Sequence, residues 1–363
     1  MFLAVRELMF ARGRFALMGS VIALVAVLTV LLSGLSNGLV DDGISGLRAL
    51  PVSHLAFQDG ADSTFSRSTI GEDSVRAFDD VPDASAEPFG LTLVNATTGG
   101  DKNVDLALVG LADGGFIAGD LLSDGTPAPG TAVITQGLAD AGVKIGDTLK
   151  VDRTDISLKI TGIAPKATYG HVDLVYTSLQ DWQAVAHLDP SGGTEIGSVV
   201  AISGGDDAAL DRVGSDAGLD VVTRTEAYAG SPGYSAETST MSLIRGFLYV
   251  ISAMILGSFF TVWTIQRRSE IGLQKALGAS TGAVLRDALG QVLIVLVLAT
   301  AFGALVGFVL GTLIEGGEVP FALDPGTVLS AALILIVAGA IGMVVGIRKV
   351  TSVDPIIALG ASA

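Results

Sequence analysis

The chain has 363 residues, half of them apolar, and a mean hydropathy of +0.61. It is therefore too apolar for an ordinary soluble protein and too polar for membrane helices alone. It has no cysteine and only three scattered histidines, which excludes disulfides, thiolate metal sites, covalent c-type haem attachment and a zinc signature. A net charge of −16 argues against a basic surface for nucleic acid.

The N-terminal region predicts a membrane anchor. Residues 1–14 mix apolar and charged side chains, as in an amphipathic helix lying along the inner membrane face. Residues 15–39 predict the first transmembrane helix, since about 20 apolar residues span a hydrocarbon core of roughly 30 Å. Arginines before this span also fit a secretory signal peptide, but no Ala-x-Ala-like cleavage site follows.

Residues 40–240 predict a separate polar domain. They hold 11 Lys and Arg against 30 Asp and Glu, so 11 − 30 gives this segment a net charge of −19. Residues 41–100 are rich in Asp, Ser and Ala with weak periodicity, which suggests a mobile part.

Residues 100–203 show clearer periodicity. We expect a small α+β domain with a strand over 104–110 and a strand and helix within 132–141. Strands over 147–151 and 156–163, a helix over 182–187 and a strand over 198–203 follow.

The remaining chain predicts three more membrane helices. These are 241–266, 285–314 and 327–347, separated by a cytoplasmic helix over 267–284 and an external loop over 315–326, with a cytoplasmic tail over 348–363. Glycines four residues apart predict close helix packing. They lie at 34 and 38, at 303, 307 and 311, and at 342 and 346.

The basic residues of the short loops predict the orientation. They fall before the first span, between the second and third, and after the fourth, which places both termini in the cytoplasm and the acidic domain outside. The chain has neither a P-loop nor a Rossmann glycine motif, so we expect no nucleotide hydrolysis by the common P-loop route.

The stretch Arg267-Arg-Ser-Glu-Ile-Gly-Leu-Gln-Lys-Ala-Leu-Gly-Ala-Ser280 has an apolar face beside a charged one, and could dock on a soluble partner or lie at the interface as a plain helix. It resembles the coupling region of the MacB/FtsX-type permeases of ABC transporters. The stretches Gly146–Leu149 followed by Ile160–Ile163, and Val353–Leu359, resemble that family as well.

The family resemblance implies a permease without its own ATPase activity. It would work as a homodimer, or as a heterodimer of related permeases, with two ATPase subunits. The residues that would couple to the ATPase are Arg267, Arg268, Glu270, Ile271, Lys275 and Gly278.

Four short stretches resemble the haem-exporting, HrtB-like permeases of Gram-positive bacteria: 1–10, 33–39, 168–171 and 234–237. This resemblance implies haem as the transported substrate, with no permanently bound cofactor. It places Tyr169 and Tyr234 at tyrosines of that group implicated in haem handling, and Glu237 at an acidic residue near them. His171, Met241 and Arg245 complete the predicted haem-binding set.

Spacing adds a chemical argument for this set. Tyr234, Glu237, Met241 and Arg245 are three, four and four residues apart, so a helix starting near Tyr234 would align them on one side at the outer leaflet. Glu237 or Met241 could ligate the haem iron, Tyr234 could ligate it or stack on the porphyrin, and Arg245 could pair with a propionate.

Ordinary roles fit the same residues. Tyrosine is common at membrane interfaces, arginine reaches for headgroups, glutamate can cap a helix and methionine fills apolar space. Tyr169 and His171 could also be incidental residues of a solvated loop. Two alternative functions stay open: export of a lipid, lipopeptide or peptide antibiotic, and FtsX-type signalling that activates a cell-wall hydrolase.

Overall fold

The computed structural model describes residues 12–100, 102–122, 125–187, 195–266, 280–315, 317 and 319–350. The chain divides into two compact units. One comprises Met1–Leu39 and Thr238–Ala363, and the other is Val40–Glu237.

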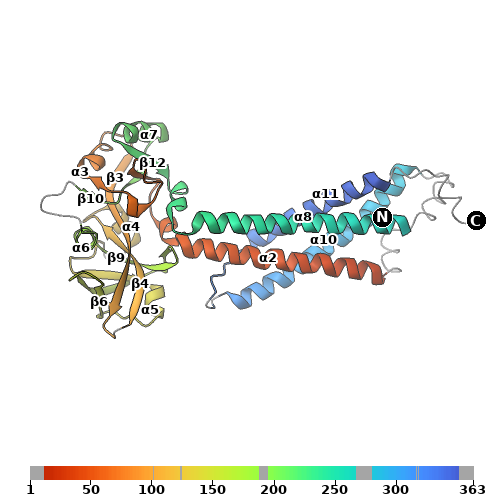
Figure 1. Ribbon diagram of the computed structural model, residues 1–363, viewed down its shortest axis with the longest axis horizontal. Helices are drawn as coiled ribbons and strands as arrows, with labels where there is room; N and C mark the ends of the chain where they lie inside the picture. Colours follow the sequence, from red (N-terminus) through yellow and green to blue (C-terminus); the bar gives the residue numbers. More distant parts are fainter. Residues whose placement is uncertain are drawn as a thin grey trace, which may run out of the picture. The chain divides into compact units, whose positions relative to one another are not determined.

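The first unit contains the membrane helices (Figure 1). The long helices in the described part of the chain are α2 (Arg12–Ala49), α8 (Tyr234–Gln266), α10 (Thr281–Ile314) and α11 (Pro325–Val350). Each contains a stretch long and apolar enough to cross a membrane: Phe15–Ala49, Tyr234–Phe259, Leu289–Ile314 and Pro325–Val344. The predicted class, four membrane helices with an α+β domain inserted between the first and second, is confirmed.

Several helix boundaries differ from those expected. Helix α2 ends at Ala49 and not near residue 39, because Ile44 and Leu47 pack into the core of the second unit although the sequence around them turns polar. Helix α8 begins at Tyr234, before the predicted start at 241. Helix α11 begins at Pro325, where Asp324 accepts hydrogen bonds from the N–H groups of Gly326 and Thr327.

Glycines let the membrane helices approach closely, as their spacing predicts. A Cβ on Gly303 would overlap the carbonyl oxygen of Ala23 on α2, and a Cβ on Gly342 would overlap Ala253 on α8. Gly38 of α2 instead accommodates the segment that leads into α11, since a Cβ there would overlap the backbone of Pro320.

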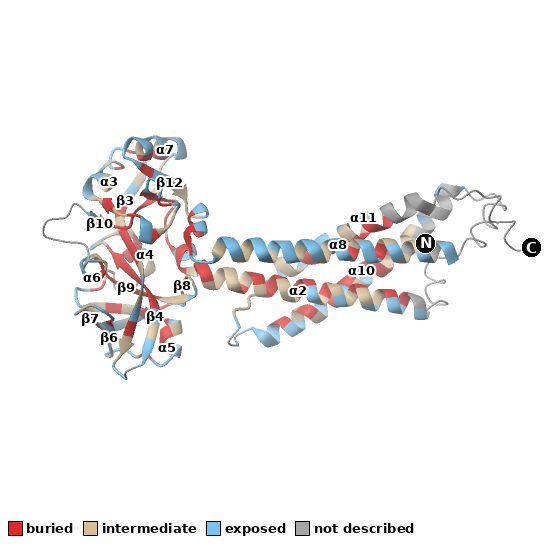
Figure 2. Ribbon diagram, viewed as in Figure 1, coloured by how far each residue is buried: buried red, intermediate tan, exposed pale blue. Residues whose placement is uncertain are grey.

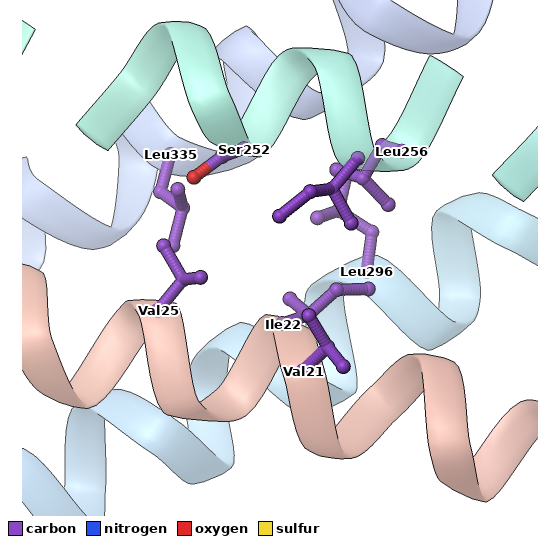
Figure 3. Close-up of a pocket in the computed structure, with 8 residues that line it drawn as sticks. Val21, Ile22, Val25, Ser252, Leu256, Leu296 and Leu335 are labelled. Carbon is purple, nitrogen blue, oxygen red and sulfur yellow. The ribbon is translucent and has the colours of Figure 1, made fainter. Parts of the chain in front are cut away.

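A small apolar cavity lies among the four helices of this unit (Figure 3). Its volume is about 10 Å³, close to the space of a single water molecule. Ser252 is the polar residue of its lining, and its hydroxyl donates to the carbonyl of Leu248. The other lining residues include Val21, Ile22, Val25, Leu256 and Leu296.

The second unit is built on a sheet. Its strands are β1 (His54–Gln58), β2 (Ile70–Gly71), β3 (Ala84–Thr98), β4 (Asn103–Leu111), β5 (Thr131–Thr135), β6 (Thr148–Val151), β7 (Ser157–Ala164), β8 (Thr168–Tyr169), β9 (Val172–Ser178), β10 (Glu195–Gly197), β11 (Val199–Gly204) and β12 (Leu219–Thr223). Its short helices are η1 (Phe65–Arg67), α3 (Glu72–Arg76), α4 (Phe116–Leu121), α5 (Gln136–Asp140), α6 (Leu179–Val185), α7 (Asp207–Asp216) and η2 (Glu226–Gly230).

Strands β2 and β10 form a separate two-stranded sheet, and the other strands form a large sheet with a closed part and an open part. The pairings β3–β4, β4–β9, β9–β5, β5–β7, β7–β6 and β6–β3 return to their starting strand and form a ring. The open part runs from β3 through β11 and β1 to β12. Three clusters of buried apolar side chains belong to this unit, and Figure 2 shows the buried residues along its strands.

The segment 41–100, in which weak periodicity suggested a mobile part, contains regular structure. That segment holds the last turns of α2, strands β1 and β2, helix α3 and the long strand β3, whose Phe89 and Leu91 are buried. Strand β3 pairs along its length with β11, then with β4 and then with β6. The strands expected from residue 104 onward agree with β4, β5, β6, β7 and β11 within one or two residues.

Candidate functional site

The candidate haem-binding residues lie on α8 and on the hairpin formed by β8 and β9. Because α8 begins at Tyr234, residues 234, 237, 241 and 245 all belong to one helix, as the predicted alignment requires. Met241 and Arg245 are half-buried. The side chain of Glu237 is 32% exposed.

Tyr234 packs against the core of the second unit. Its ring meets that of Tyr228 edge to face, with 6.1 Å between the centroids and 70° between the planes. It also borders the buried cluster that includes Leu47 and Tyr169. The aromatic body of Tyr234 therefore helps to seat the first turn of α8 on this unit.

His171 connects two helices through its ring. Nε2 lies 3.1 Å from Oε1 of Glu237 in the first turn of α8, and Nδ1 lies 3.1 Å from Oδ2 of Asp42 in α2. An ionised carboxylate accepts hydrogen bonds and donates none, so a ring nitrogen that carries a hydrogen donates to the carboxylate that it faces.

The backbone of the hairpin fixes the position of this ring. Thr168 pairs with Asp173 and Tyr169 with Val172, so Gly170 and His171 form a two-residue turn. Their φ angles are +57° and +67°, which is the pattern of a type I′ turn. The N–H of Gly170 donates to the carbonyl of Gly43 on α2 at 2.9 Å. Tyr169 was expected in a loop and instead ends a strand, while His171 occupies the turn.

Tyr169 is buried, with 3% of its surface exposed. Its hydroxyl donates to the carbonyl of Gly230 at 3.2 Å, and its ring packs edge to face on Phe65. Burial raises the pKa of Tyr169 well above its usual value, so the phenolate that would bind ferric iron is strongly disfavoured in this conformation.

The surroundings of Asp42 are acidic. Asp173 on β9 lies near it, and burial raises the pKa of Asp173 although the hydroxyl of Thr135 donates to its carboxylate at 3.0 Å. Lys166 lowers the same pKa, and Asp42 raises it further. His171 thus meets a region with a surplus of carboxylates.

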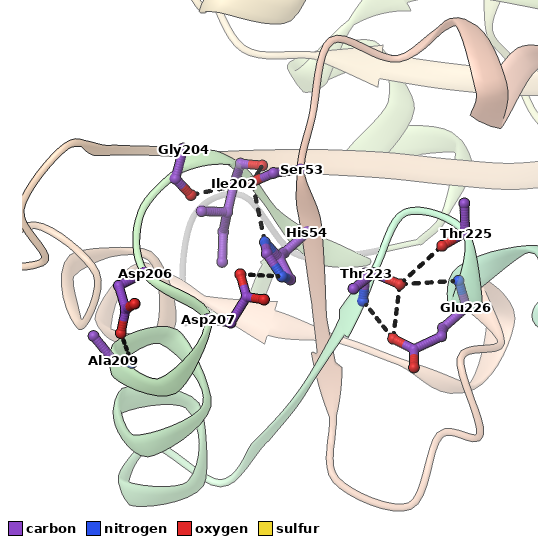
Figure 4. A network of polar contacts seen from close by, with 10 residues as sticks. All are labelled: Ser53, His54, Ile202, Gly204, Asp206, Asp207, Ala209, Thr223, Thr225 and Glu226. Carbon is purple, nitrogen blue, oxygen red and sulfur yellow. Dashed lines mark hydrogen bonds and ion pairs between the residues drawn. The ribbon is translucent and has the colours of Figure 1, made fainter.

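A second histidine, His54, belongs to a separate network in this unit (Figure 4). Its Nδ1 lies 3.0 Å from the hydroxyl of Ser53, and its Nε2 lies 3.5 Å from Asp207 at the start of α7. The hydroxyl of Ser53 donates to the carbonyls of Ile202 and Gly204 on β11. These contacts join β1, β11 and α7, and they fit a structural role.

Asp42 was absent from the predicted site. The acidic pair that it forms with Asp41, directly after the first apolar span, is the signal that could have identified it. The predicted ATPase-coupling residues, between 267 and 278, lie outside the described residues. In the described ranges, no three His, Asp or Glu side chains are arranged to hold a metal ion.

Comparison with known families identifies the class of the chain. Residues 242–355 match the family described as FtsX-like permease C-terminal. This segment contains most of α8 and all of α10 and α11. The chain is a multi-pass membrane protein with an FtsX-like permease C-terminal domain, and it is similar to ABC transporter permeases of the FtsX/MacB type.

Curated relatives match along the whole length. A protein of Staphylococcus haemolyticus, provisionally named hemin transport system permease protein HrtB, is 26% identical over 362 residues, covering 99% of each chain. An uncharacterised ABC transporter permease of Mycobacterium bovis is 23% identical over 368 residues, again covering 99% of each.

A solved structure, the periplasmic region of MacB from Actinobacillus actinomycetemcomitans, is also similar. It is 13% identical and has a TM-score of 0.34, with 49% of this chain and 92% of that chain covered.

Proposed function

We propose that the chain is the permease subunit of an efflux pump that captures haem from the outer leaflet of the membrane and expels it. Relatives of the same length that are provisionally named as hemin permeases support haem as the cargo. A separate ATPase subunit, present in two copies, drives the cycle of a permease homodimer.

The observation that carries this proposal is the composition of α8. The helix begins with a polar turn that includes Glu237, and an apolar stretch able to span the membrane follows. Met241 and Arg245 continue from Glu237 at four-residue steps. A porphyrin is apolar at its edges, carries anionic propionates and offers two axial positions on iron, which suits a carboxylate or thioether ligand followed by a guanidinium.

The surroundings of the predicted haem-binding residues suggest a role for several of them. We assign Glu237, with Met241 as the alternative, to the iron and Arg245 to a propionate. Tyr234 contributes an aromatic surface at the start of the helix. Tyr169, buried and hydrogen-bonded to Gly230, supports this region from within the core, and its predicted contact with haem stays a prediction.

Orientation and coupling complete the proposal. The basic residues of the short loops favour cytoplasmic termini in the plasma membrane and an external location for Val40–Glu237. The segment 267–278 would then face the cytoplasm, where Arg267, Glu270 and Lys275 can dock on the ATPase.

A second candidate cargo is a lipid, because α10 and α11 enclose a wide apolar groove. Its volume is about 480 Å³, and its lining includes Val297, Ala301, Ala304, Phe308, Val328 and Leu333. A groove of this size could hold an acyl chain, and it presents no iron ligand.

A haem titration of the purified full-length permease tests the proposal. Ferric haem is added to the protein in nanodiscs, and the Soret band is followed for the wild type, Glu237→Gln and Met241→Leu. Glu315→Gln is the matched control, since Glu315 is an exposed carboxylate just beyond the end of α10.

We expect a saturable, shifted band in the wild type and in the control, and its weakening in at least one of the α8 variants. Non-specific partitioning that is equal in all four proteins would contradict haem as the cargo. In that case the lipid candidate predicts tightly retained lipid, measured by mass spectrometry, that Ala301→Phe displaces from the groove.

A further inference from the structure

The proposed iron ligand Glu237 already uses one of its carboxylate oxygens in a contact with His171. Oε1 of Glu237 lies 3.1 Å from Nε2 of His171. A carboxylate oxygen that accepts a hydrogen bond from an imidazole at this distance has a lone pair directed at the ring. In this arrangement Glu237 is engaged before any cargo arrives.

Helix α2 and the hairpin of β8 and β9 hold the His171 ring that contacts Glu237. The ring of His171 is itself held by Asp42 of α2 through Nδ1, at 3.1 Å. Its backbone is fixed in a two-residue turn that is hydrogen-bonded to Gly43 of α2. A Cβ on Gly233, just before α8, would lie 2.9 Å from Oε1 of Glu237, so glycine at this position leaves room for the carboxylate.

The partial burial of all three side chains strengthens the link. The side chains of His171, Asp42 and Glu237 are 32%, 27% and 32% exposed. Contacts screened from bulk water in this way are stronger than those of fully exposed pairs. A non-glycine residue at φ +67° is also uncommon, and such strain persists only where the surroundings enforce it.

We propose that His171 is a latch that holds Glu237 in the absence of cargo, and that haem displaces it by competing for the Glu237 carboxylate. This inference rests on the proposed function and adds a positioning residue to it. His171 acts through Glu237 and does not itself bind the iron. A ring nitrogen that donates a hydrogen bond to a carboxylate has no lone pair for a metal, and both ring nitrogens face carboxylates.

The latch gives cargo binding a structural consequence. A ligand shifts a conformational equilibrium only if it interacts differently with the two states. Haem bound to Glu237 favours the state in which His171 is released, and release removes the side-chain link from the first turn of α8 to α2. Occupation of the site is thereby communicated to the ends of two long helices.

The test compares haem affinity in His171→Asn with that in the wild type, using the full-length permease in nanodiscs. Asparagine tolerates positive φ, so the turn is preserved while the ring that spans the two carboxylates is lost. We expect binding to tighten by about tenfold, because Glu237 no longer has to leave a hydrogen-bond partner. The Soret maximum should stay where it is in the wild type.

Two further variants make the comparison specific. Asp42→Asn weakens one of the two contacts of the His171 ring and leaves the contact with Glu237. Haem binding should therefore tighten less than in His171→Asn. In the double variant His171→Asn with Glu237→Gln the tightening should disappear, because the two changes act on the same contact. Hydrogen exchange of the amide of Glu237, which donates to the carbonyl of Gly233, measures the latch without haem and should quicken in His171→Asn.

The outcomes separate the two proposals. A wild-type permease without a saturable band would overturn the proposed function and the latch together. A normal wild-type band with affinity unchanged in His171→Asn would overturn the latch alone. Weaker binding with a displaced Soret maximum in that variant would also overturn it, and would make His171 an iron ligand.

Discussion

The hydroxyl of Tyr169 donates a hydrogen bond to the carbonyl of Gly230, which lies four residues before α8 begins. Tyr169 ends β8, so this contact ties the hairpin that carries His171 to the segment leading into α8. Both residues belong to the second unit, and both are buried. The pair therefore stabilises the region on which the proposed haem site depends.

Tyr169→Phe removes this hydrogen bond and leaves the aromatic packing intact. We expect the free energy of unfolding of the second unit to fall by about 0.5–1.5 kcal/mol, because the buried carbonyl of Gly230 loses a partner. The Soret band of the haem-loaded permease should keep its position. Urea unfolding and a haem titration of the same variant measure both quantities. A displaced Soret band would contradict the structural role and make Tyr169 a ligand.

Glu87→Gln should change how the stability of the second unit depends on pH. Glu87 is buried and accepts hydrogen bonds from the N–H groups of Phe116, at 2.6 Å, and Ile117, at 3.3 Å. Burial raises its pKa above the ordinary 4.5, although these two bonds lower it. The native state thus holds the proton more tightly than the unfolded chain. The resulting stability is present below pH 4.5 and is lost as the pH rises through the raised native pKa.

Glutamine does not ionise, so this loss should be absent in Glu87→Gln, and the stability of the variant relative to the wild type should rise from about pH 4 to about pH 7. Glu226→Gln is a control of opposite sign. Hydrogen bonds from Thr223 lower the pKa of Glu226, so its contribution is present at high pH and is lost as the pH falls. Urea unfolding followed by Trp182 fluorescence, in a Trp263→Phe background, measures both series. Parallel pH profiles in the two series would refute the assignment.

Gly38→Ala should destabilise the membrane unit. The added Cβ would overlap the backbone of Pro320, and backbone atoms cannot move aside as a flexible side chain can. We expect a loss of about 1–3 kcal/mol, as for other overpacked sites. The apparent melting temperature in detergent measures it.

Gly290→Ala is the matched control, because a Cβ on Gly290 of α10 meets no atom within 4 Å. Alanine favours a helix over glycine by up to about 1 kcal/mol, so this variant should be neutral or slightly more stable. Equal shifts in the two variants would show that close packing at Gly38 does not limit stability.

The membrane helices and several strands were predictable because their signals are local. Uninterrupted apolar runs predicted the four membrane spans, and the alternation of apolar and polar residues around 147–163 predicted β6 and β7. The coupling motif and the short haem-permease stretches were equally local, since they are read from consecutive residues.

The features missed by the sequence depend on distant contacts. Helix α2 continues past its apolar run because residues such as Ile44 find partners in the core of the second unit, which no local pattern reveals. The link between Asp42, His171 and Glu237 joins positions separated by 129 and 66 residues. Spacing along one helix could suggest Glu237, but only the fold shows that His171 already engages it.

The fifteen residues of β3 have a consequence for how the second unit unfolds. Its first part pairs with β11 in the open sheet, and its later part pairs with β4 and β6 in the closed ring. Because one strand belongs to both parts, separating β3 from the strands of one part would also disturb its pairing in the other part. The open sheet and the ring are therefore expected to unfold as one cooperative block, so that their slowest-exchanging amides share a single protection factor.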